Sequence, residues 1–208
     1  MKNGWILVFA GCLLAAYNTK GQNGDSLSNK AWQIEINPLI YFVPEDVYLL
    51  PIVKADKGRL HLESRYNYED FNTFSLFGGY HFSGGKKLSY TITPMLGFAI
   101  GQVDGIAPGL ELELNLGRFS YYTEAEYLFE LNDKDNSFFY NWSELSFAPA
   151  DWVWFGTSWQ RLKAYKSDKE IDPGVMLGFG RKNWELTGYY FNPFGEYDFG
   201  VISLSVTF

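Results

Sequence analysis

Four glutamates at alternating positions are the residues of this sequence whose spacing most suggests chemistry. Glu111 and Glu113 are two residues apart, and so are Glu124 and Glu126. Residues two apart on a β-strand point to the same face of the sheet. A two-residue turn at 117–118 would place Glu111 directly opposite Glu124, where like charges destabilise the pair. Water, cations or basic side chains must therefore offset this charge.

Two histidines, His61 and His81, are the only ones in the chain. Both fall on the same predicted strand face as Glu63, and a hairpin centred on Phe71 would bring them together. Two imidazoles and one carboxylate are a common ligand set for divalent transition metals. A pair of ordinary interior histidines explains the pattern as well and is the interpretation that we prefer. We therefore expect no bound metal and no cofactor.

The first 30 residues have the composition of an export segment. Lys2 precedes an apolar run over 5–17, which is too short to cross a bilayer as a helix. We predict a secretory signal peptide at 1–21 and a short polar linker at 22–30. Cys12 lies inside the apolar run, so we interpret it as a residue of the signal core rather than a lipidation site. Cleavage would remove this single cysteine, and the mature chain would have no disulfide.

The composition limits the classes of protein to which this chain can belong. A chain of 208 residues fits one domain, and its 19% aromatic content and 21 glycines suit strands, turns and membrane-interface girdles. The net charge of −7 and the absence of a Lys/Arg stripe argue against nucleic-acid binding. Beyond residue 22, no apolar run approaches the roughly 18 residues that a transmembrane helix needs.

Segments of alternating polarity recur along the rest of the chain, as in Leu110, Leu112 and Leu114 against Glu111 and Glu113. This alternation is typical of transmembrane barrel strands. We predict an all-β, antiparallel up-and-down barrel over 31–208, with ten strands as the alternative to twelve. The predicted strands are 31–42, 47–55, 58–69, 72–83, 86–101, 106–117, 118–130, 137–148, 151–165, 170–182, 183–193 and 196–208.

The predicted connections alternate between tight turns and longer loops. The tight turns fall at 56–58, 83–85, 117–118, 149–150 and 182–183. Basic residues gather around these turns, whereas acidic residues dominate the loops between them. Membrane barrels have short periplasmic turns and longer outer loops, so this division also predicts the orientation.

The chain ends in apolar residues at every second position, with Ile202, Leu204 and Val206 leading to Phe208. This pattern resembles the C-terminal signal of bacterial outer-membrane β-barrel proteins, which the barrel-assembly machinery reads. The resemblance implies a Gram-negative outer-membrane location after Sec export, with membrane lipid, lipopolysaccharide and the assembly machinery as partners. The alternative is a soluble exported sandwich or lipocalin-like barrel, which would bury the apolar faces in a core.

Acidic side chains dominate the predicted inner face of the barrel. This lining comprises Glu35, Glu63, Glu111, Glu113, Glu124, Glu126 and Glu185. In a water-filled lumen it would favour cations, whereas Arg65 and Lys54 could instead bridge the carboxylates in a closed interior. We expect a narrow, porin-like passive diffusion pore, with a closed structural or surface-interaction barrel as the alternative.

The segment His81-Phe82-Ser83 resembles the His-x-Ser pair of outer-membrane phospholipases and lipid A deacylases. That resemblance would imply a lipid-modifying enzyme with Ser83 as nucleophile. The sequence departs from the phospholipase pattern at Gly84, where an asparagine would stand. The segment also falls at the predicted periplasmic end, far from outer-leaflet lipid. We therefore expect no enzymatic activity.

Overall fold

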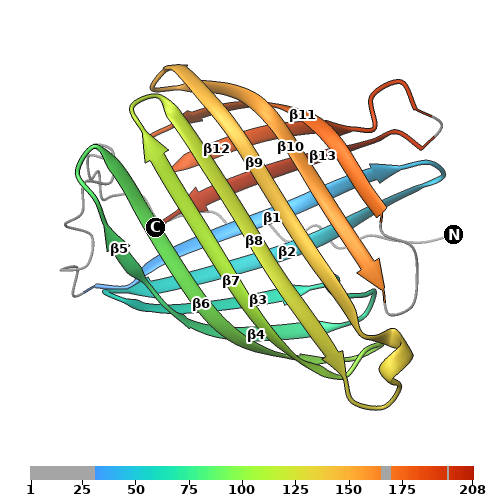
Figure 1. The fold of residues 1–208 in the computed structure, drawn as a ribbon. Helices are drawn as coiled ribbons and strands as arrows, with labels where there is room; N and C mark the ends of the chain where they lie inside the picture. Colours follow the sequence, from blue (N-terminus) through green and yellow to red (C-terminus); the bar gives the residue numbers. More distant parts are fainter. Residues whose placement is uncertain (1–30, 165–169, 196) are drawn as a thin grey trace, which may run out of the picture.

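The computed structural model describes residues 31–164, 170–195 and 197–208, and these form a single antiparallel sheet. The sheet closes on itself because Phe74–Tyr80, at one end of the strand order, also pairs with Leu88–Ile100 near the other end. Figure 1 shows the tilted strands around the barrel. Among these described residues no helix is long and apolar enough to cross a membrane. The predicted signal peptide and linker at 1–30 lie outside the described residues.

The barrel has twelve strands, as the sequence predicts, and the alternative of ten is wrong. Strands β4 and β5 are two parts of one strand, since both pair with β6 and only His81 separates them. The strands are β1 (Gln33–Val43), β2 (Asp46–Lys57), β3 (Leu60–Tyr66), β4 (Phe74–Tyr80), β5 (Phe82–Gly84), β6 (Leu88–Ile100), β7 (Gly105–Leu116), β8 (Phe119–Glu130), β9 (Phe138–Ala150), β10 (Val153–Ala164), β11 (Glu170–Arg181), β12 (Trp184–Phe191) and β13 (Phe199–Thr207).

One end of the barrel, the turn end, carries the short connections 58–59, 85–87, 117–118, 151–152 and 182–183. The other, the loop end, carries 44–45, 67–73, 101–104, 131–137 and the segment after β12, and includes the 3-10 helix η2 (Lys134–Asn136). Three predicted turns are misplaced, because the strands run on to Lys57, Gly84 and Ala150. The prediction that all connections at the loop end are longer also fails at 44–45, which is a two-residue turn.

The outer wall is apolar along its height. On β3, exposed Leu60, Leu62 and Tyr66 alternate with buried His61, Glu63 and Arg65. The same outward pattern recurs on every side of the barrel and includes Ile36, Leu49, Leu76, Leu96, Leu110, Phe155, Leu177, Leu186 and Ile202. Such a continuous apolar surface suits lipid and not water. The soluble alternative, in which these faces form a core, is therefore wrong.

Aromatic side chains flank this apolar belt at both ends. Trp32, Phe82, Phe119, Trp152 and Trp184 are exposed at the turn end. Exposed aromatics at the loop end include Phe42, Phe74, Phe129, Phe194 and Tyr197. Two such girdles mark the levels of the membrane–water interfaces in transmembrane barrels.

Side chains pack the inside of the barrel in two apolar clusters. The first contains Leu39, Tyr41, Leu50, Ile52, Trp142, Phe191 and Val201. The second contains Phe77, Met95, Ala99, Val103, Ala107 and Leu128. The second cluster depends on a residue without a side chain, since a Cβ added at Gly97 would lie 2.4 Å from the Phe77 ring. Charged residues occupy the space between the clusters.

Candidate lumen site

Arg65 is the centre of a charged cluster in the lumen. It projects inward from β3, and its side chain is fully buried. Its Nε donates to Oε1 of Glu63 at 2.7 Å, and its Nη1 donates to Oε2 of Glu126 at 3.0 Å. Its Nη2 lies 2.7 Å from Oε1 of Glu124, an ionic contact without hydrogen-bond geometry. A single guanidinium thus connects carboxylates from β3 and β8.

Two aromatic rings also pack against the same guanidinium. The Arg65 Cζ atom lies 4.4 Å from the ring centroids of Tyr68 and Phe77. Tyr68 packs against the first apolar cluster, and Phe77 belongs to the second. Cation–π contacts of this kind stabilise a desolvated guanidinium. Arg65 therefore fills the gap between the two apolar clusters.

Lys54 forms the second basic centre of the cluster. Its Nζ donates to Oε1 of Glu111 at 2.7 Å and lies 3.7 Å from Oε2 of Glu63. The Tyr122 hydroxyl also contacts Oε1 of Glu111 at 2.9 Å and Oε2 of Glu124 at 3.2 Å. Glu111 pairs directly with Glu124 across β7 and β8, so the predicted juxtaposition is confirmed.

The cluster contains more acidic than basic groups. Glu69, from the loop between β3 and β4, is also buried, with Oε1 3.8 Å from Nη1 of Arg65. Burial raises the pKa of Glu69 above its ordinary value, although the Arg65 guanidinium opposes this shift. The carboxylates of the cluster are Glu63, Glu69, Glu111, Glu124 and Glu126, against the cations of Arg65 and Lys54.

The remaining three glutamates of the predicted acidic lining are at the turn end, apart from the Arg65 cluster. Glu35 and Glu113 are partly exposed and Glu185 is exposed. Their strand registers place them on the inner face: Glu35 pairs with Lys54, and Glu113 with Tyr122. The predicted lining therefore divides into a buried, ion-paired group and a solvent-accessible group at the turn-end mouth.

The two histidines lie together near the turn end, but not through the predicted register. The hairpin is centred on Asp70, since His61 pairs with Gly79, and His81 is therefore diagonal to His61. The 67–73 loop fixes this register through the Asn67 N–H, which donates to the Thr73 carbonyl. The two ring centroids are nevertheless 5.1 Å apart.

Asp56 joins the histidines and was absent from the predicted site. Its Oδ1 lies 2.7 Å from Nδ1 of His61 and 2.9 Å from Nε2 of His81. The sequence interpretation assigned Asp56 to a turn, whereas β2 continues through it and pairs it with His61. The alternation from Lys54 to Asp56 was the signal that would have identified it.

The hydroxyl of Ser83 is not aligned with His81. Ser83 Oγ pairs with Oγ1 of Thr91 at 3.0 Å, whereas the His81 ring nitrogens face Thr93 and Asp56. A serine nucleophile requires a hydrogen bond to its general base. The described contacts therefore give no support to the lipid-hydrolase interpretation.

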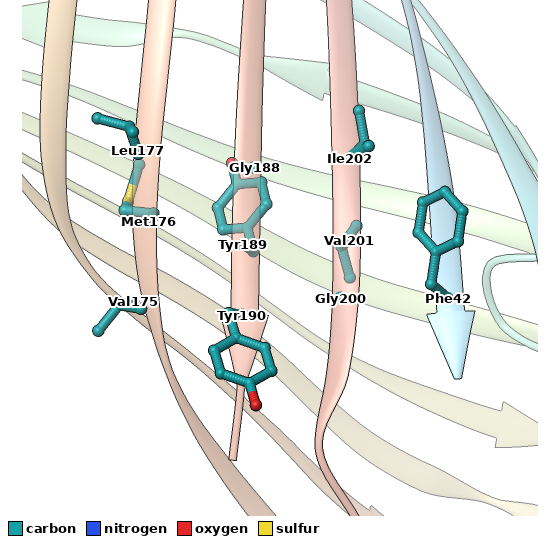
Figure 2. Close-up of a pocket in the computed structure, with 10 residues that line it drawn as sticks. All are labelled: Phe42, Val175, Met176, Leu177, Gly188, Tyr189, Tyr190, Gly200, Val201 and Ile202. Carbon is teal, nitrogen blue, oxygen red and sulfur yellow. The ribbon is translucent and has the colours of Figure 1, made fainter. Parts of the chain in front are cut away.

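A depression on the outer wall, drawn in Figure 2, lies apart from this site. It spans β11, β12, β13 and β1, and Gly188 and Gly200 leave room among exposed Val175, Leu177 and Ile202. Its outward side chains belong to the apolar belt. The depression is therefore part of the lipid-facing surface.

Comparisons with known proteins agree with this architecture. No protein-family model and no curated protein matches the sequence. Among solved structures, the chain is similar to the KdgM porin, with 13% identity, a TM-score of 0.65, and coverage of 84% of this chain and 99% of that chain. It is also similar to the KdgM porin in complex with disordered oligogalacturonate, with 13% identity, a TM-score of 0.63, and coverage of 85% and 99%. The chain thus has the fold of a small outer-membrane β-barrel, as the sequence predicts.

Proposed function

We propose that this protein is a porin-like channel of the outer membrane whose lumen is closed at rest by the Arg65 cluster. When the cluster opens, the channel passes small cationic or neutral polar solutes. The observation that carries this proposal is the position of Arg65, fully buried between two apolar clusters and bound to carboxylates of β3 and β8. A buried cluster with excess negative charge is a constriction that hydration or an added cation can loosen.

The outer-membrane location is supported by the surface of the barrel. The apolar belt and two aromatic girdles match the requirements of a bilayer. The short connections then face the periplasm and the longer loops face outward, with the predicted export signal and C-terminal strand serving secretion and assembly. Membrane lipid, lipopolysaccharide and the assembly machinery are the proposed partners.

A preference for cations is supported by the charge of both mouths. Glu35, Glu113 and Glu185 line the turn end. At the loop end, a hollow is lined in part by Glu69, Asp70 and Asp135. Rings of acidic side chains concentrate cations and repel anions at the entrances of a pore.

The substrate class of the structural neighbour does not transfer to this chain. Oligogalacturonate, the molecule named in the KdgM complex, is a polyanion. The predominantly acidic lumen of the present barrel would repel such a solute. Cationic and neutral solutes are the proposed alternative.

Uptake by proteoliposomes tests this proposal. Vesicles would contain the wild-type barrel, the Arg65→Ala variant or a Lys87→Gln control, which alters an exposed residue at the turn end. Lysine, glucose and glutamate serve as solutes of different charge. We expect slow uptake by the wild type and faster uptake of lysine and glucose with Arg65→Ala. Equal entry of glutamate would contradict the cation preference.

A closed structural barrel is the second candidate, favoured by the apolar packing of the lumen. Tyr41, Trp142 and Phe191 are all buried on the inner face, and their rings pack with neighbouring aromatics. If this packing alone seals the lumen, removing Arg65 leaves the barrel impermeable. A folded Arg65→Ala variant that admits none of the three solutes would therefore support the closed barrel and overturn the channel.

A further inference from the structure

We propose that Asp56, His61 and His81 form a binding site for a divalent transition metal, of which Zn²⁺ is the representative ion. The site would lie inside the barrel near its turn end. It is independent of the proposed channel function, because a metal can bind there whether or not the lumen conducts. Among the described residues, neither histidine pairs with Arg65 itself, although His61 contacts Glu63 of the Arg65 cluster.

The three side chains converge from neighbouring strands and present their donor atoms to one another. Nδ1 of His61 and Nε2 of His81 approach the same oxygen, Oδ1 of Asp56, at 2.7 and 2.9 Å. The three donor atoms all lie within 4.8 Å of one another. Ligand atoms of a tetrahedral zinc site are roughly 3.3 Å apart, because each lies about 2.0–2.1 Å from the metal. Small outward movements of these side chains would therefore admit the ion.

The nitrogens of the two rings that point away from Asp56 already have the partners that metal-bound histidines need. Nε2 of His61 lies 3.3 Å from Oε2 of Glu63, and Nδ1 of His81 lies 2.8 Å from Oγ1 of Thr93. Arg65 fixes Glu63 in turn through its Nε, at 2.7 Å. A metal-ligating histidine usually donates its second N–H to a carboxylate or another oxygen acceptor, which fixes the tautomer and the ring orientation.

The hydrogen-bond acceptors around His61 also favour a cation at this position. A neutral imidazole has one N–H and one lone pair. Both nitrogens of His61 face carboxylate oxygens, which only accept hydrogen bonds. In a neutral ring, the nitrogen without a proton would therefore point its lone pair at a carboxylate oxygen. A second proton on the ring or a metal ion at Nδ1 removes this conflict. The metal would also add two positive charges beside an acid-rich cluster.

The types of ligand atom indicate which ion would bind, and the exposure of the ligands indicates how it would enter. Two nitrogens and one carboxylate oxygen suit Zn²⁺, Co²⁺ or Ni²⁺, whereas Ca²⁺ and Mg²⁺ prefer oxygen ligands. His61 is buried, but the side chains of His81 and Asp56 are 17% and 35% exposed, which leaves an approach from the turn-end mouth. A second possible group, His61 with Glu63 and Glu111, is less suitable because Lys54 already pairs with Glu111 and Arg65 with Glu63.

Calorimetry and histidine NMR on the refolded barrel in detergent, without a histidine tag and after dialysis against chelator, test this site. We expect one saturable equivalent of Zn²⁺. Because the chain has only two histidines, both sets of ring resonances report on the site, and both should shift together on titration with ZnCl₂. Asp56→Asn and His81→Gln should each weaken binding about tenfold or more, and Thr93→Val should weaken it about tenfold through the ring orientation.

Asp151→Asn is the matched control, since it removes a fully exposed acidic residue at the turn end, outside the three ligands and outside the acidic lining. It should leave the affinity unchanged. A difference in gel migration between unheated and heated samples checks that each variant is folded. The proposal is overturned if Zn²⁺ does not saturate, if Asp56→Asn and His81→Gln bind like the wild type, or if the ring resonances respond to pH but not to Zn²⁺. None of these results depends on solute flux.

Discussion

Nη2 of Arg65 on β3 lies 2.7 Å from Oε1 of Glu124 on β8, which joins two strands that are not neighbours in the sheet. The backbone ladder fixes the wall of the barrel, whereas this contact fixes its interior. Both side chains are buried, so the interaction is only weakly screened by water or salt. We therefore expect Arg65 to stabilise the interior and, in the proposed channel, to close it.

Replacing Arg65 should destabilise the folded barrel strongly. Arg65→Ala leaves the carboxylates of Glu63, Glu124 and Glu126 without their main counter-charge. Breaking a buried ion pair by removing one partner costs about 3–5 kcal/mol in unfolding free energy. Urea unfolding of the barrel reconstituted in lipid vesicles measures this loss, with the exposed Lys87→Gln as the control that should leave the midpoint unchanged.

A double variant distinguishes charge from packing in this result. Glu124→Gln in the Arg65→Ala background removes one of the stranded carboxylates, so we expect it to restore part of the lost stability. The two substitutions should be non-additive because their side chains are in contact. If their effects simply add, the Arg65–Glu124 contact does not stabilise the barrel.

The wall of this barrel could be predicted because it depends on local features of the sequence, namely the alternation of side chains and the length of the turns. Strict alternation on segments such as 106–117 predicts which side chains face lipid, and the structure places Leu110 outward and Glu111 inward. The two-residue turn at 117–118 fixed the register of β7 and β8, and with it the pairing of Glu111 with Glu124. Turn length and the period of two determine both outcomes.

The interior was less predictable because it depends on longer connections and on side-chain volume. The 67–73 loop shifts the β3–β4 register from the expected centre at Phe71 to Asp70, and no local rule determines such a shift. The period of two placed Arg65 and Lys54 inside the barrel. It did not show that Tyr68 and Phe77 would pack against the Arg65 guanidinium, because that depends on rotamers and on the space left by Gly97.

Adding a methyl group at Gly97 should disrupt the second apolar cluster. The new Cβ of Gly97→Ala would lie 2.4 Å from the ring of Phe77, which is fully buried, so the ring would have to shift. Overpacking of this kind costs about 1–3 kcal/mol in unfolding free energy. Gly188→Ala is the matched control, since its nearest neighbouring atom would be 4.0 Å away. Equal unfolding midpoints for the two variants would show that the lumen is not tightly packed.

Charge on the outer wall should reveal the position of the bilayer. Ile202 is exposed in the middle of β13, whereas Val47 is exposed close to the loop end. Ile202→Arg should lower folding stability in vesicles by about 2–4 kcal/mol, and Val47→Arg by no more than about 1 kcal/mol, because the cost falls from the midplane to the interface. Equal costs at the two positions would contradict the proposed membrane belt.

Single-channel recording in planar bilayers tests the central claim most directly. The wild-type barrel should stay closed for most of the record, because Arg65 and its carboxylates fill the lumen between the two apolar clusters. Arg65→Ala should show frequent openings, with a reversal potential in a KCl gradient that indicates preference for K⁺ over Cl⁻. A folded Arg65→Ala barrel that remains as silent as the wild type, or one that opens with preference for Cl⁻, would contradict the account.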